Sequence, residues 1–242
     1  MQDQTIALVT GATAGLGKAI AEKLASDGLL VIVLGRDADR GGDVVRGIEA
    51  RGGHARFVRA DLADPKSIER IVAEVAAIGP VDVLVNNAGY AWYGPTATLD
   101  AAAFDALFAI NVRATYLMVS AFAPAMAERK RGSIVNIGSV LGAITTPHSA
   151  AYGATKAAIA SLTRSWAAEF APSGVRVNNV APGPIEAQGA KGERTAALGK
   201  GTLLGRAATN AEIAEAVAFL ASPKASYITG TTLLADGGLS VI

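Results

Sequence analysis

The chain contains 242 residues, with 22 Lys and Arg against 21 Asp and Glu, and its formal net charge is +1. The hydrophobic fraction of 51% excludes a disordered chain, because disorder requires low hydrophobicity and high net charge. The balanced charge gives no electrostatic sign of nucleic-acid binding. The chain has no cysteine, which excludes disulfides, redox dithiols and thiolate metal sites.

Membrane insertion and metal binding are also not expected. Residues 132–155 lack Asp, Glu, Lys and Arg, but they are too polar for a spanning helix, which needs about 20 predominantly apolar residues. The first residues lead directly into an apolar run, without the basic start of a secretory signal. The two histidines show no metal-ligand spacing. We therefore expect a cytoplasmic protein with no membrane segment and no essential metal.

Short apolar runs alternate with helical patterns along the whole chain. The runs predict strands at 6–10, 30–34, 55–59, 81–85, 133–137, 175–180 and 232–234. Between them, helices are expected near 16–27, 38–51, 66–77, 100–127, 153–170 and 211–221. This alternation predicts an α/β fold with a doubly wound parallel sheet of about seven strands. No linker divides residues 1–242, so one domain is expected, and the glycine-rich segment 187–205 is interpreted as a mobile substrate lid.

Gly11, Gly15 and Gly17 form a G-x-x-x-G-x-G turn between the first strand and the first helix. Glycines at such a turn let the backbone approach a pyrophosphate, whose charge meets the helix N-terminus. A tight turn of small packing residues is the alternative, because short motifs also match by chance. The strand–turn–helix context favours a dinucleotide cofactor.

Tyr152 and Lys156 are four residues apart, so they share one face of the predicted helix. The ordinary pKa of a phenol is about 10, and lowering it to about 7 requires about 4 kcal/mol. A nearby ammonium and a positively charged nicotinamide could supply that in a desolvated site. The phenol could then exchange a proton with a carbonyl or alcohol oxygen. An isolated pair of this kind is also common on the surface of an amphipathic helix.

Ser139 follows the predicted strand 133–137 and lies 13 residues before Tyr152. Its hydroxyl could donate a hydrogen bond to a substrate oxygen as negative charge develops there. A turn residue at the end of a strand is the simpler interpretation of Ser139 alone. Asn111 lies inside the predicted helix 100–127, where asparagine is mildly unfavourable.

These motifs, with Asn86-Asn87-Ala88-Gly89, Asp61, Pro182-Gly183 and Asp236-Gly237-Gly238, resemble the short-chain dehydrogenase/reductase family. The resemblance covers essentially the whole chain, and the chain is similar to the single-domain members that reduce 3-oxoacyl-ACP. It implies a reversible, nicotinamide-dependent reduction of a small-molecule carbonyl to a secondary alcohol. It also implies a homotetramer, with helices 100–127 and 153–170 at one interface.

The resemblance assigns roles to individual residues. Tyr152 would be the general acid/base, Lys156 its electrostatic partner and ribose anchor, and Ser139 the group that polarises the carbonyl. Asn111 would kink its helix and hold a water of a proton relay. The implied cofactor contacts are Gly11, Thr13, Gly15, Leu16, Gly17, Arg36, Asp61, Leu62, Asn87, Ala88, Gly89, Tyr152, Lys156, Pro182, Gly183 and Ile185.

The end of the second predicted strand bears on the choice of cofactor. Relatives that prefer NAD place an acid there, whereas this chain has Arg36, which suits the 2′-phosphate of NADP. NADP(H) is therefore favoured over NAD(H), although Asp37 is adjacent and Ala14 stands where NADP-preferring relatives often have a basic residue. An NAD-dependent dehydrogenase of a sugar or hydroxy compound, and a non-catalytic nicotinamide-binding sensor, are the alternatives.

The substrate side is less well specified. Trp92, Tyr93, Leu141 and His148 are candidates for an acceptor pocket, where aromatic residues are common. The aromatic pair could equally pack under the lid, and His148 could be a turn residue after Pro147. The chain departs from the family at Ala187, where a threonine often follows the Pro-Gly motif, and Gln188 or the backbone would have to replace its hydroxyl.

Overall fold

One parallel sheet runs through the computed structural model, which describes residues 4–187 and 189–241. Among those residues its seven strands lie in the order β3-β2-β1-β4-β5-β6-β7. The strands are β1 Ile6–Thr10, β2 Leu30–Gly35, β3 His54–Arg59, β4 Val83–Asn86, β5 Gly132–Ile137, β6 Val175–Pro182 and β7 Thr232–Ala235. All neighbouring pairs are parallel, so the predicted doubly wound sheet is confirmed.

Strands β1 and β2 are almost entirely apolar because both faces of the sheet are covered there. In β1, Ala7, Leu8 and Val9 are all inaccessible to solvent. Continuous aliphatic runs are typical of strands buried on both faces. Short apolar runs located every strand, including the half-exposed β3, with differences of one or two residues at some ends.

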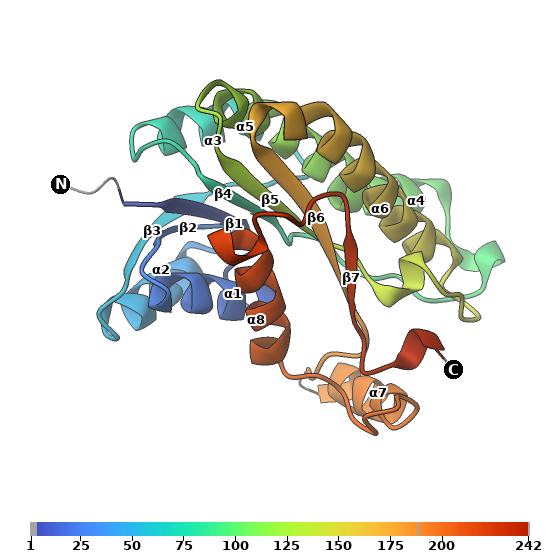
Figure 1. Ribbon diagram of the computed structural model, residues 1–242. Helices are drawn as coiled ribbons and strands as arrows, with labels where there is room; N and C mark the ends of the chain where they lie inside the picture. The colour runs from blue at the N-terminus through green and yellow to red at the C-terminus, as the bar shows by residue number, and fades with distance from the viewer. Residues whose placement is uncertain (1–3, 188, 242) are drawn as a thin grey trace.

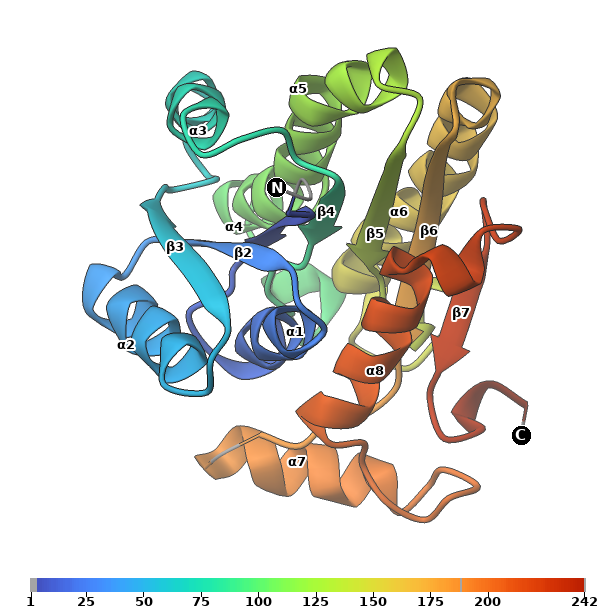
Figure 2. The ribbon, with the colours of Figure 1, turned by 60° about the vertical axis from the view of Figure 1, so that its left-hand side comes forward.

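Helices cover the sheet in two layers (Figures 1 and 2). One layer contains α1 Gly15–Ser26, α2 Ala38–Glu49 and α8 Asn210–Ala221. The other contains α3 Ser67–Ala76, α4 Ala101–Phe108, α5 Ala114–Glu128 and α6 Ala150–Phe170. Each layer forms its own hydrophobic core with one face of the sheet. The chain changes sides of β1 between β3 and β4, and ligands of open α/β sheets bind at the carboxyl ends of the strands near such a point.

The predicted helix 100–127 is not uniform. A π-helical turn at Ala109–Arg113, which contains Asn111, separates α4 from α5. Residues 101–128 also form the one helix in the described chain that is long and apolar enough to cross a membrane, with a mean hydropathy of 1.5. Leu107, Met118 and Met126 of this helix are fully buried in the protein. A core helix of a globular protein passes the same test, so this helix is weak support for membrane insertion.

The segment 187–205, interpreted from the sequence as a mobile substrate lid, contains a helix. Described residues of this segment form the helix α7 Gly189–Gly199, which lies beyond the carboxyl ends of the strands (Figure 2). Glu193, Arg194 and the alanines that follow have good helix propensity, and they outweigh the glycines near the helix ends. Gln188 lies outside the described residues.

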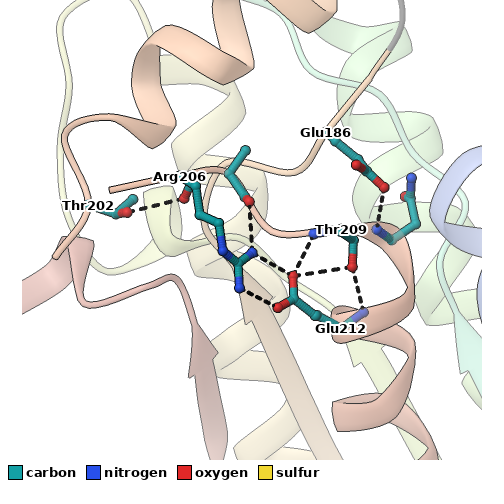
Figure 3. A network of polar contacts seen from close by, with 7 residues as sticks. Glu186, Thr202, Arg206, Thr209 and Glu212 are labelled. Atoms are coloured by element: carbon teal, nitrogen blue, oxygen red, sulfur yellow. Dashed lines mark hydrogen bonds and ion pairs between the residues drawn. The ribbon is translucent and has the colours of Figure 1, made fainter. Parts of the chain in front are cut away.

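A polar network anchors the segment on the N-terminus of α8 (Figure 3). Arg206 donates to both carboxylate oxygens of Glu212, at 2.8 and 2.6 Å. Glu212 and Thr209 form a capping box, in which each side chain bonds to the other's backbone N–H. Before α7, the Glu186 carboxylate accepts from the Asn210 N–H at 3.3 Å. Both ends of the α7 segment are therefore held at one helix terminus. The hydrogen bonds from Arg206 lower the pKa of Glu212 to about 2.

Candidate functional site

The glycine turn is closely packed at Gly11 and Gly17. Gly11 has a φ of 63°, in the left-handed region that favours glycine. A Cβ added to Gly17 would overlap the carbonyl oxygen of Gly11 and the side-chain amide of Asn87. The N-cap of α1, Ala14, has no side-chain hydrogen bond to the first turn. The helix therefore begins without a side-chain cap, as is needed where an anion is to meet its backbone N–H groups.

Asn87 ties this turn to the end of β4. Its Nδ2 donates to the carbonyl oxygens of Thr10, at 2.9 Å, and Gly11, at 3.2 Å. The Thr10 Oγ1 accepts from the backbone N–H groups of Asn87 and Ala88. The sequence motifs after β1 and after β4 therefore form one rigid unit at the topological switch point.

A cavity of about 470 Å³ lies at the carboxyl ends of β2 and β3. Its lining residues are Arg36, Arg59, Ala60, Asp61, Arg70 and Glu74. The Arg59 Nε donates to the Arg36 carbonyl at 3.1 Å, which joins the two strand ends. Within the described part of the chain, Arg36 has no ion-pair partner. The cavity can therefore offer its guanidinium to an anion.

Asp37, the acid next to Arg36, is used elsewhere. Its carboxylate caps α2 by accepting from the Arg40 N–H at 3.1 Å, and it pairs with the Arg40 Nε at 3.2 Å. Asp37 is thus committed to helix α2 by a side-chain cap, which typically stabilises a helix by about 1 kcal/mol.

Ser139, Tyr152 and Lys156 lie together at the carboxyl end of β5. Lys156 is 6% exposed, its Nζ donates to the Ile137 carbonyl at 2.8 Å, and the same atom is 5.7 Å from the centre of the Tyr152 ring. The Ser139 side chain lies close enough to the Tyr152 hydroxyl to act on the pKa of the phenol. The Ser139 Oγ also accepts from the Leu141 N–H at 3.2 Å, which orients it.

The electrostatics of this cluster differ from the expected effect of the lysine. Burial raises the pKa of Tyr152 above its ordinary value, Tyr93 raises it further, and the nearby Ser139 hydroxyl opposes both. Burial also lowers the pKa of Lys156 to about 8. The ammonium is bonded to a backbone carbonyl, and desolvation of the phenol is the largest cause of the shift in the Tyr152 pKa. Lys156 alone therefore does not make Tyr152 more acidic.

Asn111 connects the π-helical turn to both sides of the site. Its Oδ1 accepts from the Tyr90 N–H at 3.0 Å, and its Nδ2 donates to the Tyr90 carbonyl at 2.9 Å and to Thr155 Oγ1 at 3.1 Å. A Cβ on Gly89 would lie 2.8 Å from Asn111 Oδ1 and 3.9 Å from Lys156 Nζ. Asn111 is thus placed beside Lys156 and fixes the backbone that follows the Asn-Asn-Ala-Gly motif.

Among the predicted pocket residues, Tyr93 packs against Tyr152. Its ring centre is 5.7 Å from that of Tyr152. The His148 carbonyl accepts from the Gly94 N–H at 3.0 Å, so the two predicted pocket segments meet through the backbone, while the His148 side chain is exposed. Trp92 is close to Gly94. Leu141 contributes its backbone N–H to Ser139 and its carbonyl to the packing against Gly153.

The remaining predicted cofactor residues lie along the same edge of the sheet. Thr13 is close to Gly35 at the end of β2, and Leu62 is buried below Asp61. Pro182 ends β6, and Gly183 is so close to Asp236 that a Cβ would lie 2.7 Å from its Cα. Ile185 forms a parallel bridge with Ala208.

Arg194 is a residue of this site that the motifs did not identify. Its guanidinium carbon lies 3.7 Å from the centre of the Tyr93 ring. The two residues are far apart in sequence, and Arg194 was visible there only as one of several cations in a glycine-rich segment.

Comparison with known proteins identifies the family. Residues 11–240 match the family described as enoyl-(acyl carrier protein) reductase. The cis-4-hydroxycyclohexanecarboxylate dehydrogenase of Sinomonas cyclohexanicum is 39% identical, with 99% of this chain and 98% of that protein covered. The chain belongs to the short-chain dehydrogenase/reductase family. It is therefore an oxidoreductase that acts on carbonyl or CH–OH groups with a nicotinamide cofactor.

Two further members of the family share the full-length match. The 3-oxoacyl-[acyl-carrier-protein] reductase FabG of Vibrio cholerae is 38% identical, with 98% of each chain covered. The crystal structure of a gluconate 5-dehydrogenase from Burkholderia cenocepacia, in complex with NADP and tartrate, superimposes with a TM-score of 0.92 at 30% identity. That match covers 99% of this chain and 96% of the other. The resemblance found in the sequence is confirmed.

Proposed function

We propose that this member of the family is an NADP(H)-dependent ketone reductase, acting reversibly on the secondary alcohol, with Tyr152 as its general acid/base. The observation that carries the proposal is the meeting of Ser139, Tyr152 and Lys156 at the end of β5. A non-catalytic sensor would not need this set to be complete. The substrate carbonyl would lie against the Tyr152 and Ser139 hydroxyls.

The residues around the glycine turn fit a dinucleotide. Gly11 and Gly17 keep the backbone free of side chains where a pyrophosphate would lie, and α1 begins without a side-chain cap. Thr13, Gly15 and Leu16 complete this turn. Asp61 and Leu62 would lie beside the adenine, while Asn87, Ala88, Gly89, Pro182, Gly183 and Ile185 would line the rest of the cleft. When bound, NADP(H) supplies or accepts the hydride.

The side chains would perform the proton transfer. In reduction, the neutral Tyr152 hydroxyl gives its proton to the carbonyl oxygen as negative charge develops there, and in oxidation the phenolate takes the proton back. Ser139 already accepts from the Leu141 N–H, which leaves its own O–H to donate to the same substrate oxygen. The raised pKa of Tyr152 keeps the phenol protonated near neutral pH, as carbonyl reduction requires.

Lys156 and Asn111 would support Tyr152. The pKa of Lys156, about 8, allows it to exchange a proton near neutral pH and to return one to the phenolate. We assign Asn111 to holding this part of the site in place, because its amide bonds to the Tyr90 backbone and to Thr155 Oγ1. Thr155 in turn donates to the Tyr152 carbonyl at 2.7 Å, which links Asn111 to the turn of α6 that carries Tyr152.

Two observations support NADP(H) over NAD(H). Arg36 lines the cavity at the ends of β2 and β3 without an acidic partner among the described residues, and the adjacent Asp37 is committed to capping α2. An arginine suits a 2′-phosphate, whereas a free acid suits the 2′-hydroxyl of NAD. The related gluconate 5-dehydrogenase was solved in complex with NADP. Titration with both cofactors tests the preference, and tighter binding of NAD would overturn it.

The relatives suggest which substrates to test first. They are named for a hydroxycyclohexanecarboxylate, a 3-oxoacyl thioester on a carrier protein, and gluconate. We propose a small ketone or its alcohol as the substrate of this chain. The test is NADPH consumption with a panel of cyclic keto acids, oxoacyl thioesters, sugars and steroids. If no substrate in the panel were turned over in a reaction that requires Tyr152, the proposed function would be contradicted.

We further propose that the protein is a cytoplasmic homotetramer. Phe104 and Tyr116 on the α4–α5 face are 41% and 50% exposed, and Val241 near the C-terminus is 73% exposed. Burial of such large apolar side chains would stabilise subunit interfaces. Light scattering tests the assembly, because a tetramer has four times the 24.5 kDa mass of one chain. The mass of a monomer would contradict it.

A further inference from the structure

Arg194 reaches the catalytic cluster through a single aromatic ring. Its guanidinium lies 3.7 Å from the centre of the Tyr93 ring, and that centre is 5.7 Å from the centre of the Tyr152 ring. The sum of the two distances, 9.4 Å, is the upper limit for the separation of the guanidinium carbon from the Tyr152 ring centre. One small molecule can therefore contact Tyr152 and Arg194 together.

The charge of Arg194 is not neutralised by a carboxylate in the described part of the chain. Arg206, in the segment that follows α7, shows the contrast, because it makes two hydrogen bonds to Glu212. Glu186, which precedes α7, accepts from the Asn210 backbone. The Arg194 guanidinium instead contacts the face of the Tyr93 ring.

Stacking on a ring leaves the donors of a guanidinium available. An arginine carries five N–H donors in one plane, and a contact through its flat face uses none of them. The Tyr93 ring also holds the guanidinium in place, so less side-chain entropy is lost when an anion binds. Tyr93, which contacts the guanidinium, and Tyr152, whose ring packs at a tilt against Tyr93, are neutral phenols near neutral pH. The electrostatic environment at Arg194 therefore favours an anion.

We propose that Arg194 is the anion-binding residue of the substrate site, and that the preferred substrate is a small ketone carrying a carboxylate. The carboxylate would bind the guanidinium above Tyr93 while the ketone oxygen lies at Tyr152 and Ser139. This inference rests on the proposed function and narrows its substrate class. A guanidinium fork matches the geometry of a carboxylate, so two parallel hydrogen bonds would form.

The test compares two substrates that differ by one charge. Both 4-oxocyclohexanecarboxylate and its carboxamide are offered to the full-length protein with NADPH, and kcat and KM are measured. Arg194→Met removes the charge and keeps an unbranched apolar stem. Arg194→Lys keeps the charge without the fork, and Lys200→Met is a control on the same segment. Melting temperatures show that each variant is folded.

The wild-type protein should favour the carboxylate. Arg194→Met should lower its kcat/KM for the carboxylate by about 10- to 100-fold, mainly through KM, which is the range expected for a hydrogen-bonded charge. The same variant should reduce the carboxamide within about two-fold of wild type, and Arg194→Lys should be intermediate for the carboxylate. Lys200→Met should match wild type with both substrates.

Other results separate the two proposals. An equal loss for both substrates in Arg194→Met would mean that Arg194 acts only by packing α7 on Tyr93, and it would overturn the inference. A wild-type protein that prefers the carboxamide, or that reduces other ketones but not the carboxylate, would also overturn it and leave the proposed function intact. The absence of Tyr152-dependent turnover with every ketone would overturn the proposed function itself.

Discussion

The Lys156 ammonium donates to the carbonyl oxygen of Ile137 at 2.8 Å, across the junction between β5 and α6. The bond places a buried cation between the end of β5 and helix α6. Burial lowers the pKa of Lys156 to about 8, from an ordinary value of 10.5. This depressed pKa links the proposed proton transfer to the stability of the fold.

The first prediction concerns that link. Between about pH 8 and 10.5 the unfolded chain binds more protons at Lys156 than the folded chain does, so the free energy of unfolding should rise with pH there. Lys156→Met lacks this contribution. Urea unfolding of both proteins at several pH values in this window, without cofactor, measures the difference. If the free energy of unfolding of both proteins had the same pH dependence, the lowered pKa of Lys156 in the folded protein would be contradicted.

A second prediction concerns the cofactor. Arg36→Ala should weaken NADP(H) binding by about 10- to 100-fold, because hydrogen bonds to charged groups are worth about 1.5–3 kcal/mol. Binding of NAD(H), which lacks the 2′-phosphate, should change little. Arg40→Ala is the matched control, since Arg40 pairs with Asp37 and does not line the cavity. Calorimetric titration of the three proteins checks this, and equal losses for both cofactors in Arg36→Ala would speak against a phosphate contact.

The third prediction concerns the close approach at the glycine turn. Gly17→Ala places a methyl group against the Gly11 carbonyl and the Asn87 amide, so it should destabilise the fold by about 1–3 kcal/mol and weaken cofactor binding. Gly47→Ala, on the open face of α2, should instead stabilise it by about 0.5–1 kcal/mol. Chemical denaturation measures both. A neutral effect of Gly17→Ala would show that the turn can open to accept a side chain.

The fourth prediction concerns acid. The pKa of Glu212 is lowered to about 2, first by the hydrogen bonds from Arg206, against an ordinary value of 4.5. Its contribution to stability should therefore be complete above about pH 4.5 and should be lost as the pH falls towards 2. Glu212→Gln lacks that contribution at every pH. The difference in melting temperature between wild type and variant should shrink across this range, and a constant difference would contradict the ion pair.

Much of the fold and site could be predicted because the relevant signals are local. Strands β1 and β2 are buried on both faces, so they appear as almost unbroken aliphatic runs. Glycines are required in the turn after β1 because neighbouring backbone and side-chain atoms come too close to allow a Cβ at Gly17. Tyr152 and Lys156 are one helical turn apart, so their spacing is visible in the sequence. These constraints act over a few residues, so the sequence carries them directly.

The features that were missed depend on tertiary contacts. The contact of Arg194 with Tyr93 joins α7 to the loop between β4 and α4, far earlier in the sequence. No local sequence pattern predicts such a contact. The glycines in 187–205 concealed α7, and the continuous apolar pattern of 100–127 concealed the π-helical turn. The direction of the Tyr152 pKa depends on how deeply the phenol is buried, which spacing from Lys156 does not reveal.

The central claim is that Tyr152 transfers the proton to the substrate oxygen. The most direct measurement is the NADPH-dependent reduction of a ketone by Tyr152→Phe, together with NADPH affinity, on protein whose melting temperature is also recorded. The variant should keep cofactor affinity within a few-fold and lose turnover by at least about 10²- to 10⁴-fold, the usual contribution of a general acid. Turnover equal to that of wild type, with NADPH still bound, would contradict the account.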